Sequence, residues 1–313
     1  MKLIIPISMA LILAAATVSS AADETAASAS KSRTRSSEGP GTKGPPGKLF
    51  VYKHTAGEPQ QMEIFFPPNH DPSKAKVPGM ILFHGGGWSG GNLQQFRVAC
   101  AYFASRGLVC ATADYRMLSA NEARQLPAGE TKKRICVVDA KSAIRWFRRK
   151  APELGIDPHR IITGGGSAGG HISVLATTNP GLNDPGDPNE IETSVVAYVL
   201  FNPAFALDDD QDLEIDVLRH LQPKFAPAIV FFGDQDPWKK GWDKAHAKLM
   251  SLGSRSVELQ IAPGQAHGFF NREPWQTATL IAADRFLVKQ GLLSGEPTRP
   301  APATGEKLVL ANP

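Results

Sequence analysis

Six short apolar runs alternate with longer amphipathic stretches along the middle of this chain, and this alternation constrains its fold more than any other feature. Each run is rich in Val, Ile, Leu or Phe and is bounded by turn residues, which is typical of buried strands. The stretches between them have the spacing of helices, and several end at a glycine suited to a helix stop. The six runs are Met80–His84, Leu108–Tyr115, Arg160–Gly164, Val195–Phe201, Ala228–Gly233 and Val257–Ala262.

The order of these runs predicts an α/β fold with a mostly parallel sheet and helices on both of its faces. Two earlier segments, FVYKHT and QQMEIFF, are expected to form an antiparallel hairpin at the edge of that sheet. The chain has 313 residues, of which 42% are hydrophobic, so it can bury a substantial core. One folded domain is expected over residues 49–293.

Both ends of the chain differ from this middle part. The first residues carry one early lysine, a long apolar run and then small residues, which predicts a secretory signal peptide over residues 1–22. A transmembrane anchor is the alternative, but the run is shorter than the roughly 20 residues that a span needs. The stretch 23–48 is expected to be a disordered linker and the Pro-rich stretch 294–313 a flexible tail. The mature protein is therefore expected to be secreted or periplasmic.

Charge and cysteine content exclude several classes of protein. The formal net charge is only +4, and basic residues are interleaved with acidic ones, so nothing indicates nucleic-acid binding. The three cysteines, Cys100, Cys110 and Cys136, are too few for a disulfide framework and lack the spacing of a metal site. We expect buried free thiols, with a Cys100–Cys110 bridge as the alternative in an oxidising compartment.

Two motifs overlap in the stretch TGGGSAGGH, which directly follows one of the predicted strands. Gly164, Gly166 and Gly169 fit GxGxxG, a turn that binds the phosphates of a dinucleotide. Gly165, Ser167 and Gly169 fit GxSxG, a strand-to-helix turn that carries a nucleophilic serine. The two interpretations predict different functions.

The dinucleotide interpretation fits the rest of the sequence poorly. Such a site uses the first strand-to-helix turn of its domain, yet at least two predicted strands precede this glycine cluster. The acidic residue expected about 20 positions further on would be Asp184 or Asp187, and both lie in the loop sequence LNDPGDPNE rather than at a strand end. Binding of NAD is kept only as an alternative.

A nucleophilic serine needs a histidine base and an orienting carboxylate. In this type of fold both follow the serine in the sequence, and the acid precedes the histidine. Asp236 follows the predicted strand AIVFFG and His267 follows VELQIA, so both should reach the sheet edge where Ser167 lies. Asp234 is the competing acid, but it stands only one residue beyond its strand. His246 is the competing base, but it lies in a helical pattern, where an exposed histidine is the simpler explanation.

An acyl-transfer site also needs hydrogen-bond donors for the oxyanion of the tetrahedral intermediate. The segment ILFHGGGWSGGN places His84, three glycines and Trp88 directly after a predicted strand. This is the HGGG type of loop, whose bare backbone can approach the substrate oxygen. Its presence together with GxSxG favours the nucleophile interpretation over a merely flexible turn.

In these motifs the sequence resembles the esterase and lipase group of the α/β-hydrolase superfamily, related to hormone-sensitive lipase and to acetyl-xylan and feruloyl esterase-like proteins. Besides HGGGW and GGSAGG, the stretches ADYR, DAKSAIRWFRRKAPELGIDPHRI, FFGDQD and AHGF match that group in order and spacing. The resemblance covers residues 50–287 and implies the α/β-hydrolase fold. It also implies that Ser167 is the nucleophile, His267 the general base and then acid, and Asp236 the orienting carboxylate.

The same resemblance implies further roles around the oxyanion. The hole would be formed by the N–H groups of Gly86, Gly87 and Ala168, and His84 would brace the glycine loop rather than transfer protons. Arg116 is expected to be a buried ion-pair partner rather than a substrate ligand.

Substrate size is indicated by the connection between two strands. The strand that ends near Phe201 and the strand that begins near Ala228 are joined by 26 residues, which include the stretch ALDDDQDLEIDVLRHLQPKF, so no large helical lid fits there. We therefore expect an open site that hydrolyses short acyl esters, acetyl above all, through a covalent acyl-enzyme, with polysaccharide esters as candidate substrates. Trp88 would stack on a sugar or line the acyl pocket, with packing as the alternative.

Two other functions stay as alternatives: a peptidase of the same fold, and a non-catalytic relative that binds carbohydrate or protein. No propeller-sized domain precedes the hydrolase region in this sequence, which disfavours the peptidase. Every catalytic position holds a competent residue type, which disfavours the silent relative. Serine acyl chemistry needs neither metal nor organic cofactor, so no cofactor is expected. The expected partner is the ester substrate, with no stable membrane span after signal cleavage; the sequence leaves the oligomeric state open.

Overall fold

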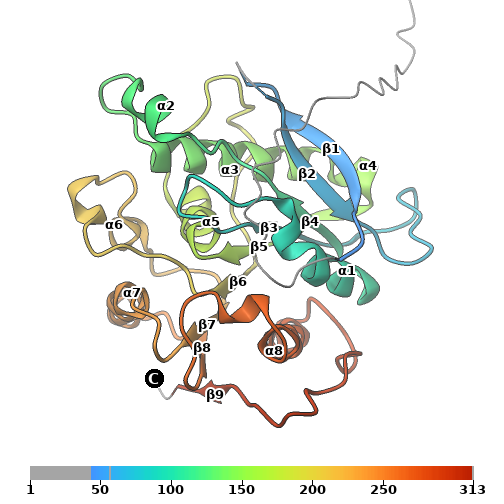
Figure 1. Ribbon diagram of the computed structural model, residues 1–313. Helices are drawn as coiled ribbons and strands as arrows, with labels where there is room; N and C mark the ends of the chain where they lie inside the picture. The colour runs from blue at the N-terminus through green and yellow to red at the C-terminus, as the bar shows by residue number, and fades with distance from the viewer. Residues whose placement is uncertain (1–43, 56–57, 312–313) are drawn as a thin grey trace, which may run out of the picture. The chain divides into compact units, whose positions relative to one another are not determined.

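The computed structural model describes residues 44–55 and 58–311, and Figure 1 shows the domain that they form. The predicted signal peptide at 1–22 and most of the predicted linker at 23–48 lie outside the described residues. The domain is built on a nine-stranded sheet with the order β1-β2-β4-β3-β5-β6-β7-β8-β9. Its strands are β1 (Lys48–Lys53), β2 (Gln60–Phe65), β3 (Val77–Phe83), β4 (Val109–Ala113), β5 (Ile156–Gly166), β6 (Ala197–Phe201), β7 (Ala228–Gly233), β8 (Val257–Ala262) and β9 (Val309–Leu310).

The centre of the sheet is parallel. β4, β3, β5, β6, β7 and β8 run in the same direction and correspond to the six apolar runs of the sequence. β1 and β2 form an antiparallel hairpin, and β2 joins β4 at that edge, also antiparallel. The predicted α/β fold, with its parallel sheet and edge hairpin, is confirmed.

Helices cover both faces of the sheet (Figure 1). Successive residues of β3, Leu82 and Phe83, point into different cores, as the alternation of a strand requires. The core around Phe83 is covered by α3, α5 and α7, and the core around Leu82 by α1 and α8. The helices are α1 (Arg97–Ser105), α2 (Ala120–Arg124), α3 (Lys132–Arg149), α4 (Ala151–Leu154), α5 (Ala168–Thr178), α6 (Val217–His220), α7 (Lys239–Ser251) and α8 (Trp275–Lys289), with 3-10 turns η1 (Leu93–Phe96), η2 (Asp209–Gln211) and η3 (Phe269–Asn271).

Two short helices, α2 and α6, were not predicted from the sequence. α2 has five residues and α6 has four, too few for an apolar stripe to repeat along the sequence. None of the helices in the described ranges combines the length and the apolar character needed to cross a bilayer.

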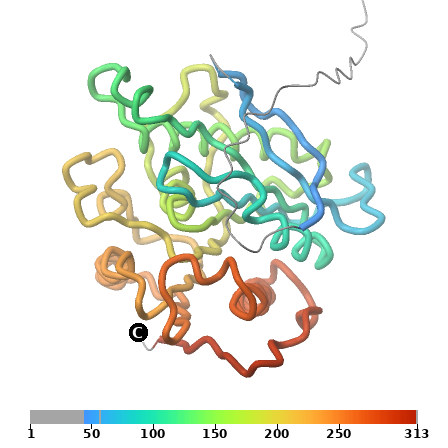
Figure 2. Tube along the Cα trace, in the orientation of Figure 1, coloured from blue at the N-terminus to red at the C-terminus, as the bar shows by residue number. Residues whose placement is uncertain are grey.

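The C-terminal segment belongs to the domain, which corrects the predicted boundary at residue 293. β9 pairs antiparallel with β8, with Val309 opposite Ile261 and Leu310 opposite Gln260. Figure 2 shows the chain after α8 passing along this end of the domain before it reaches the sheet. A strand of two residues after a Pro-rich stretch carries no alternation that could reveal it, so the segment reads as a flexible tail.

The three cysteines are free and buried, as expected. Cys100 lies in α1 and Cys110 in β4, and the alternative bridge between them is not formed. Burial and, to a smaller extent, the neighbouring Cys110 thiol raise the pKa of Cys100 well above its usual range. Its thiol is therefore protonated at neutral pH and is a poor nucleophile.

Arg116 is an ion-pair partner, as expected, although its own side chain is partly exposed. Its Nε and Nη2 atoms donate to the two oxygens of Asp139 at 2.7 and 2.8 Å. Asp139 is fully buried in α3, and Lys53 of β1 donates to it at 2.7 Å. The carboxylate thus joins the edge hairpin, the chain after β4 and α3.

A second buried carboxylate joins the two helices on the other face of the sheet. Asp284 of α8 is fully buried and accepts hydrogen bonds from Nε and Nη2 of Arg106 at 2.7 and 3.1 Å. The hydroxyl of Tyr102 in α1 donates to the same carboxylate. Removing Asp284 would leave a largely buried guanidinium without its counter-charge.

We therefore predict that Asp284→Ala lowers the free energy of unfolding by about 3–5 kcal/mol, measured by urea denaturation. The matched control is Asp243→Ala, which removes the exposed ion pair with Lys239 on α7. That control should change the stability by less than about 1 kcal/mol, because water screens the pair. Equal losses in the two variants would contradict the stabilising role of Asp284.

Candidate active site

Ser167 lies at the turn between β5 and α5, at the carboxyl edge of the parallel strands. Its backbone has φ 53° and ψ −119°, a conformation that residues other than glycine rarely adopt. The turn is sharp because α5 begins directly against β3: a Cβ on Gly169 would lie 1.9 Å from the carbonyl oxygen of Phe83. The local geometry is that of a nucleophile turn, with the serine at the tip of a strained strand-to-helix connection.

His267 and Asp236 complete a chain of hydrogen bonds with this serine. Ser167 Oγ is 2.8 Å from His267 Nε2, and His267 Nδ1 is 2.7 Å from Asp236 Oδ2. Because an ionised carboxylate only accepts, Nδ1 of a neutral imidazole carries the proton, and Nε2 accepts the serine hydroxyl. Asp236 is buried, and its Oδ1 accepts the backbone N–H of Trp238 at 2.9 Å. The structure brings together the three residues that the sequence singled out.

The competing acid and base do not join this chain. Asp234 is exposed to solvent on the turn after β7. His246 lies within α7 and stacks on Trp242, with ring centroids 6.1 Å apart. Their positions leave Asp236 and His267 as the pair that faces the serine.

The residues needed for a dinucleotide site have other contacts. Asp184 pairs with Lys53 at 2.6 Å, and Asp187 pairs with Arg145 at 3.2 Å. Gly164 lies so close to β6 that a Cβ there would be 1.9 Å from a carbonyl oxygen of that strand. The glycine therefore serves the packing of the sheet, and the acids are paired rather than presented to a ribose.

The glycine loop after β3 lies beside the serine. A Cβ on Gly85 would be 3.1 Å from the Ser167 Cβ. The N–H of Gly85 is already used, since it donates to Gln95 Oε1 at 2.6 Å. Within residues 44–55 and 58–311, the N–H groups of Gly86 and Gly87 have no acceptor. These two donors are thus available to a bound group, whereas Gly85 is not.

The third predicted donor comes from the helix that follows the serine. Ala168 is the first residue of α5, so its N–H has no acceptor within the helix. It also lies at the positive end of the helix dipole, which favours negative charge. On the facing loop Gly86 has φ 134°, and a Cβ there would lie 2.1 Å from the Gly90 carbonyl oxygen. Only glycine fits at that position.

His84 supports the base of the glycine loop. Its fully buried ring stacks on Tyr115 with centroids 4.5 Å apart. Its Nδ1 donates to the Gly85 carbonyl at 2.8 Å, and its Nε2 lies 3.2 Å from a carboxylate oxygen of Asp114. The ring is thus held by the Gly85 carbonyl and by the stacked Tyr115 ring, as a bracing residue would be.

Trp88 is buried behind the loop rather than open to solvent. Only 6% of its surface is exposed, and its Nε1–H donates to His171 Nδ1 at 3.3 Å. Lys133 Nζ lies 4.3 Å from the centroid of its ring. No open ring face is left for a sugar, so the expectation that Trp88 stacks on substrate is corrected in favour of packing.

Sequence reasoning missed two residues beside the chain of hydrogen bonds. Asn202 is fully buried, its Nδ2 lies 3.4 Å from His267 Nε2, and its Oδ1 accepts the Gly268 N–H at 3.1 Å. Trp238 is half-buried, with its ring centroid 6.3 Å from that of His267 and 6.1 Å from that of Trp88. Each follows a strand of the parallel sheet closely, which is the signal that could have found them.

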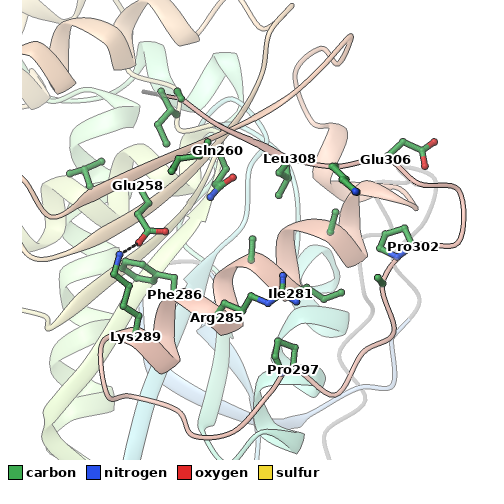
Figure 3. A pocket seen from close by; sticks show the side chains of 18 of the residues that line it. Glu258, Gln260, Ile281, Arg285, Phe286, Lys289, Pro297, Pro302, Glu306 and Leu308 are labelled. Atoms are coloured by element: carbon green, nitrogen blue, oxygen red, sulfur yellow. Dashed lines mark hydrogen bonds and ion pairs between the residues drawn. The ribbon is translucent and has the colours of Figure 1, made fainter. Parts of the chain in front are cut away.

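A separate cavity lies at a different place. A groove of about 1110 Å³ runs between β8, α8 and the C-terminal segment, and Figure 3 shows side chains of both charges along it. Glu258 pairs there with Lys289, and Pro302 and Leu308 form part of the outer wall. Neither Ser167 nor its two partners line this groove, so its size says nothing about the chemistry of the serine.

The arrangement at the sheet edge can deprotonate a hydroxyl and hold a developing oxyanion, which is what acyl transfer requires. Side chains and backbone N–H groups suffice for both tasks. In the part of the chain that the structure describes, no group of three or more His, Cys, Asp or Glu side chains could hold a metal ion.

Comparisons with known proteins agree with this geometry. The BD-FAE family model matches residues 62–204. The apo form of Thermogutta terrifontis esterase 2 is 32% identical, covers 80% of this chain and 97% of its own, and superposes with a TM-score of 0.72. The chain belongs to the esterase and lipase group of the α/β-hydrolases. It is therefore a carboxylic ester hydrolase, related to hormone-sensitive lipase.

Further relatives of this α/β-hydrolase lie in the same group. The carboxylesterase NlhH of Mycobacterium tuberculosis is 26% identical over 244 residues, which cover 67% of this chain and 71% of the relative. The propionate-bound structure of the Thermogutta esterase is 33% identical, with a TM-score of 0.72 and coverage of 80% of this chain and 97% of that one.

Asn202→Asp tests the contact between the buried amide and His267. Aspartate keeps an acceptor for the Gly268 N–H but replaces the amide donor with a carboxylate oxygen. Because a nearby negative charge favours the protonated imidazole, we predict that the acidic limb of the pH profile of kcat/KM moves up by about one pH unit. The rates are measured with p-nitrophenyl acetate.

The control for this variant is Asn183→Asp. Asn183 contacts Lys141 and Arg145 of α3 rather than His267, so its profile should match that of the unmodified protein. An unchanged acidic limb in Asn202→Asp would show that the amide does not act on His267.

Proposed function

We propose that this protein is a secreted serine carboxylesterase that removes short acyl groups, acetyl above all, from polysaccharide esters. The observation that carries the proposal is the unbroken chain of hydrogen bonds from Ser167 through His267 to Asp236. It stands beside a loop whose two glycine N–H groups have no acceptor within the described residues. These contacts support a nucleophile, a base and oxyanion donors that act on one bound carbonyl group.

In the first half of the reaction, Ser167 Oγ attacks the carbonyl carbon of the ester. His267 Nε2 takes the hydroxyl proton, and Asp236 stabilises the imidazolium that forms. The carbonyl oxygen becomes an oxyanion that backbone N–H groups hold. Those donors are Gly86, Gly87 and Ala168. When the tetrahedral intermediate collapses, His267 gives its proton to the leaving alcohol oxygen, and the acyl group stays on Ser167.

In the second half, water takes the place of the alcohol. His267 accepts a proton from the water as its oxygen attacks the acyl carbon, and the same N–H groups hold the second oxyanion. Collapse releases the carboxylic acid and returns the proton to Ser167. The reaction consumes one ester and one water molecule and returns Ser167, His267 and Asp236 to their starting state.

Three features support a short acyl group. The connection from β6 to β7 carries η2 and the four-residue α6, which is too little to form a helical lid over long chains. Trp238 narrows the space between His267 and the buried Trp88. The Thermogutta esterase structures include propionate-bound and butyrate-bound forms, and both ligands are short carboxylates.

Two features support a polymeric alcohol and an exported protein. Ser167 is half-exposed, and 31% of the His267 side chain is accessible, so an ester on a bulky chain can reach the nucleophile. The leader sequence at residues 1–22 has the lysine, the apolar run and the small residues of a cleaved signal.

The first experiment compares p-nitrophenyl acetate with p-nitrophenyl palmitate as substrates. We predict rapid release from the acetate and none from the palmitate, and a loss of about 10⁶ in kcat for Ser167→Ala with unchanged thermal stability. Paraoxon, which phosphorylates the Thermogutta esterase, should modify the peptide that contains Ser167. Acetate release from acetylated xylan, followed by chromatography, tests the polymeric substrate.

Each part of the proposal can fail separately. An active Ser167→Ala variant would remove the assigned nucleophile. Palmitate release as fast as acetate release would remove the preference for short acyl groups. Faster cleavage of an aminoacyl amide than of the acetate would favour the peptidase instead.

Secretion is tested on the exported protein itself. We predict that the mature N-terminus lies near Asp23, as determined by intact mass and terminal sequencing. Leu11→Asp places a charge in the apolar run and should leave the precursor uncut and unexported. Export of that variant at the normal rate, or a full-length secreted protein, would contradict the predicted signal peptide.

A further inference from the structure

The loop that offers the oxyanion donors has an unusual backbone. Three consecutive residues, Gly86, Gly87 and Trp88, have positive φ values of 134°, 62° and 58°. Glycine adopts such values at little cost, but for a bulky side chain they are a strained exception. Strain of this kind persists only where the surroundings hold the residue in place. The contacts of the Trp88 side chain are therefore among those that hold the shape of the loop.

The side chain of Trp88 is held by His171. The indole N–H can only donate, and it lies 3.3 Å from His171 Nδ1, so that nitrogen is the acceptor. The proton of the neutral imidazole is then on Nε2, which faces the Ile215 carbonyl at 3.1 Å. His171 is fully buried in the first turns of α5, and its backbone N–H donates to the Ser167 carbonyl at 3.2 Å. The same residue thus touches both the nucleophile turn and the oxyanion loop.

Behind His171 stands a buried carboxylate. Asp209 Oδ2 lies 3.3 Å from His171 Nε2, and Lys133 pairs with the other oxygen of Asp209. Burial alone would raise the pKa of Asp209, but the contacts with His171 and Lys133 outweigh it and hold that pKa below its usual value. Asp209 is thus ionised at neutral pH. The Nε2–H of His171 donates to the Ile215 carbonyl, and the negative charge of Asp209 at 3.3 Å favours the proton on that same nitrogen.

We propose that Asp209 and His171 are positioning residues that set the oxyanion loop through the indole N–H of Trp88. The chain of contacts runs from η2, in the connection between β6 and β7, through α5 to the loop after β3. Asp209 orients His171, His171 accepts from Trp88, and Trp88 holds Gly86 and Gly87 in the backbone conformation that leaves their N–H groups free. This inference rests on the proposed function, because it assumes that those N–H groups bind the oxyanion.

Lys133 strengthens the same assembly from α3. Its Nζ pairs with Asp209 and also lies 4.3 Å from the ring centroid of Trp88. A cation at that distance is attracted to the indole face. The carboxylate therefore places the two groups that hold the tryptophan, one at its N–H and one over its ring.

The test compares an ester with the matching thionoester, in which sulfur replaces the carbonyl oxygen. Sulfur accepts hydrogen bonds weakly, so the ratio of the two kcat/KM values measures how well the oxyanion donors are placed. We expect Asp209→Asn and His171→Phe to lower kcat for the ester by about 10- to 100-fold and to change KM much less. The ester-to-thionoester ratio should fall by about tenfold or more, because the thionoester gained little from the donors.

Two controls make this readout specific. Gly86→Ala displaces the donor loop directly and should lower the ratio as well. Asp284→Asn weakens the distant contact between α1 and α8 and should lower the stability but leave the ratio unchanged, since a loss of folded protein lowers both rates equally. Asp209→Asn keeps the size of the side chain, so it serves if His171→Phe does not fold.

The outcomes separate this inference from the proposed function. A fall in the ratio for the Asp209 and His171 variants supports their positioning role. Unchanged ratios in both variants, whether or not the ester rate falls, would overturn it. Retained hydrolysis in Ser167→Ala would instead overturn the proposed function, whatever the ratios show.

Discussion

The close packing of the first turn of α5 against the end of β3 is the constraint on which the site depends. Gly169 approaches the carbonyl oxygens of Phe83 and His84 so closely that no side chain fits between them. This approach forces the chain to turn sharply at Ser167. The amino end of α5 therefore lies at the carboxyl edge of the parallel strands. It also brings the loop after His84 beside the serine, so the same backbone contact places Ser167 next to the free N–H groups of the loop.

The glycine loop is then held from several directions at once. Gln95 accepts the N–H of Gly85, His84 bonds its carbonyl, and Lys132 donates to the hydroxyl of Ser89 at 2.9 Å. Together with the buried Trp88, these contacts fix a segment that carries almost no side chains of its own. A loop of glycines is flexible as a sequence, but here its order comes from the polar groups around it.

The sequence predicted much of this because the relevant signals are local. The apolar runs mark the parallel strands, and the order of serine, acid and histidine follows from where strands end in such a sheet. Asn202 and His171 were not predicted as partners, because their contacts join segments that are far apart in the chain. The burial of Trp88 was missed for the same reason: its cover comes from α3, α5 and the turn after β7. β9 was missed because two residues cannot show a period.

β9 makes the C-terminal segment part of the edge of the sheet. β9 spans only two residues, and with the bond from the Ala311 N–H to the Leu259 carbonyl it reaches only the middle of β8 among the described residues. Both Val309 and Leu310 are more than half exposed. Unpaired strand edges invite pairing with other chains, and apolar side chains make such pairing tighter. A tag or a truncation at this segment therefore changes the edge of the sheet. Self-association is the property that such a change affects first.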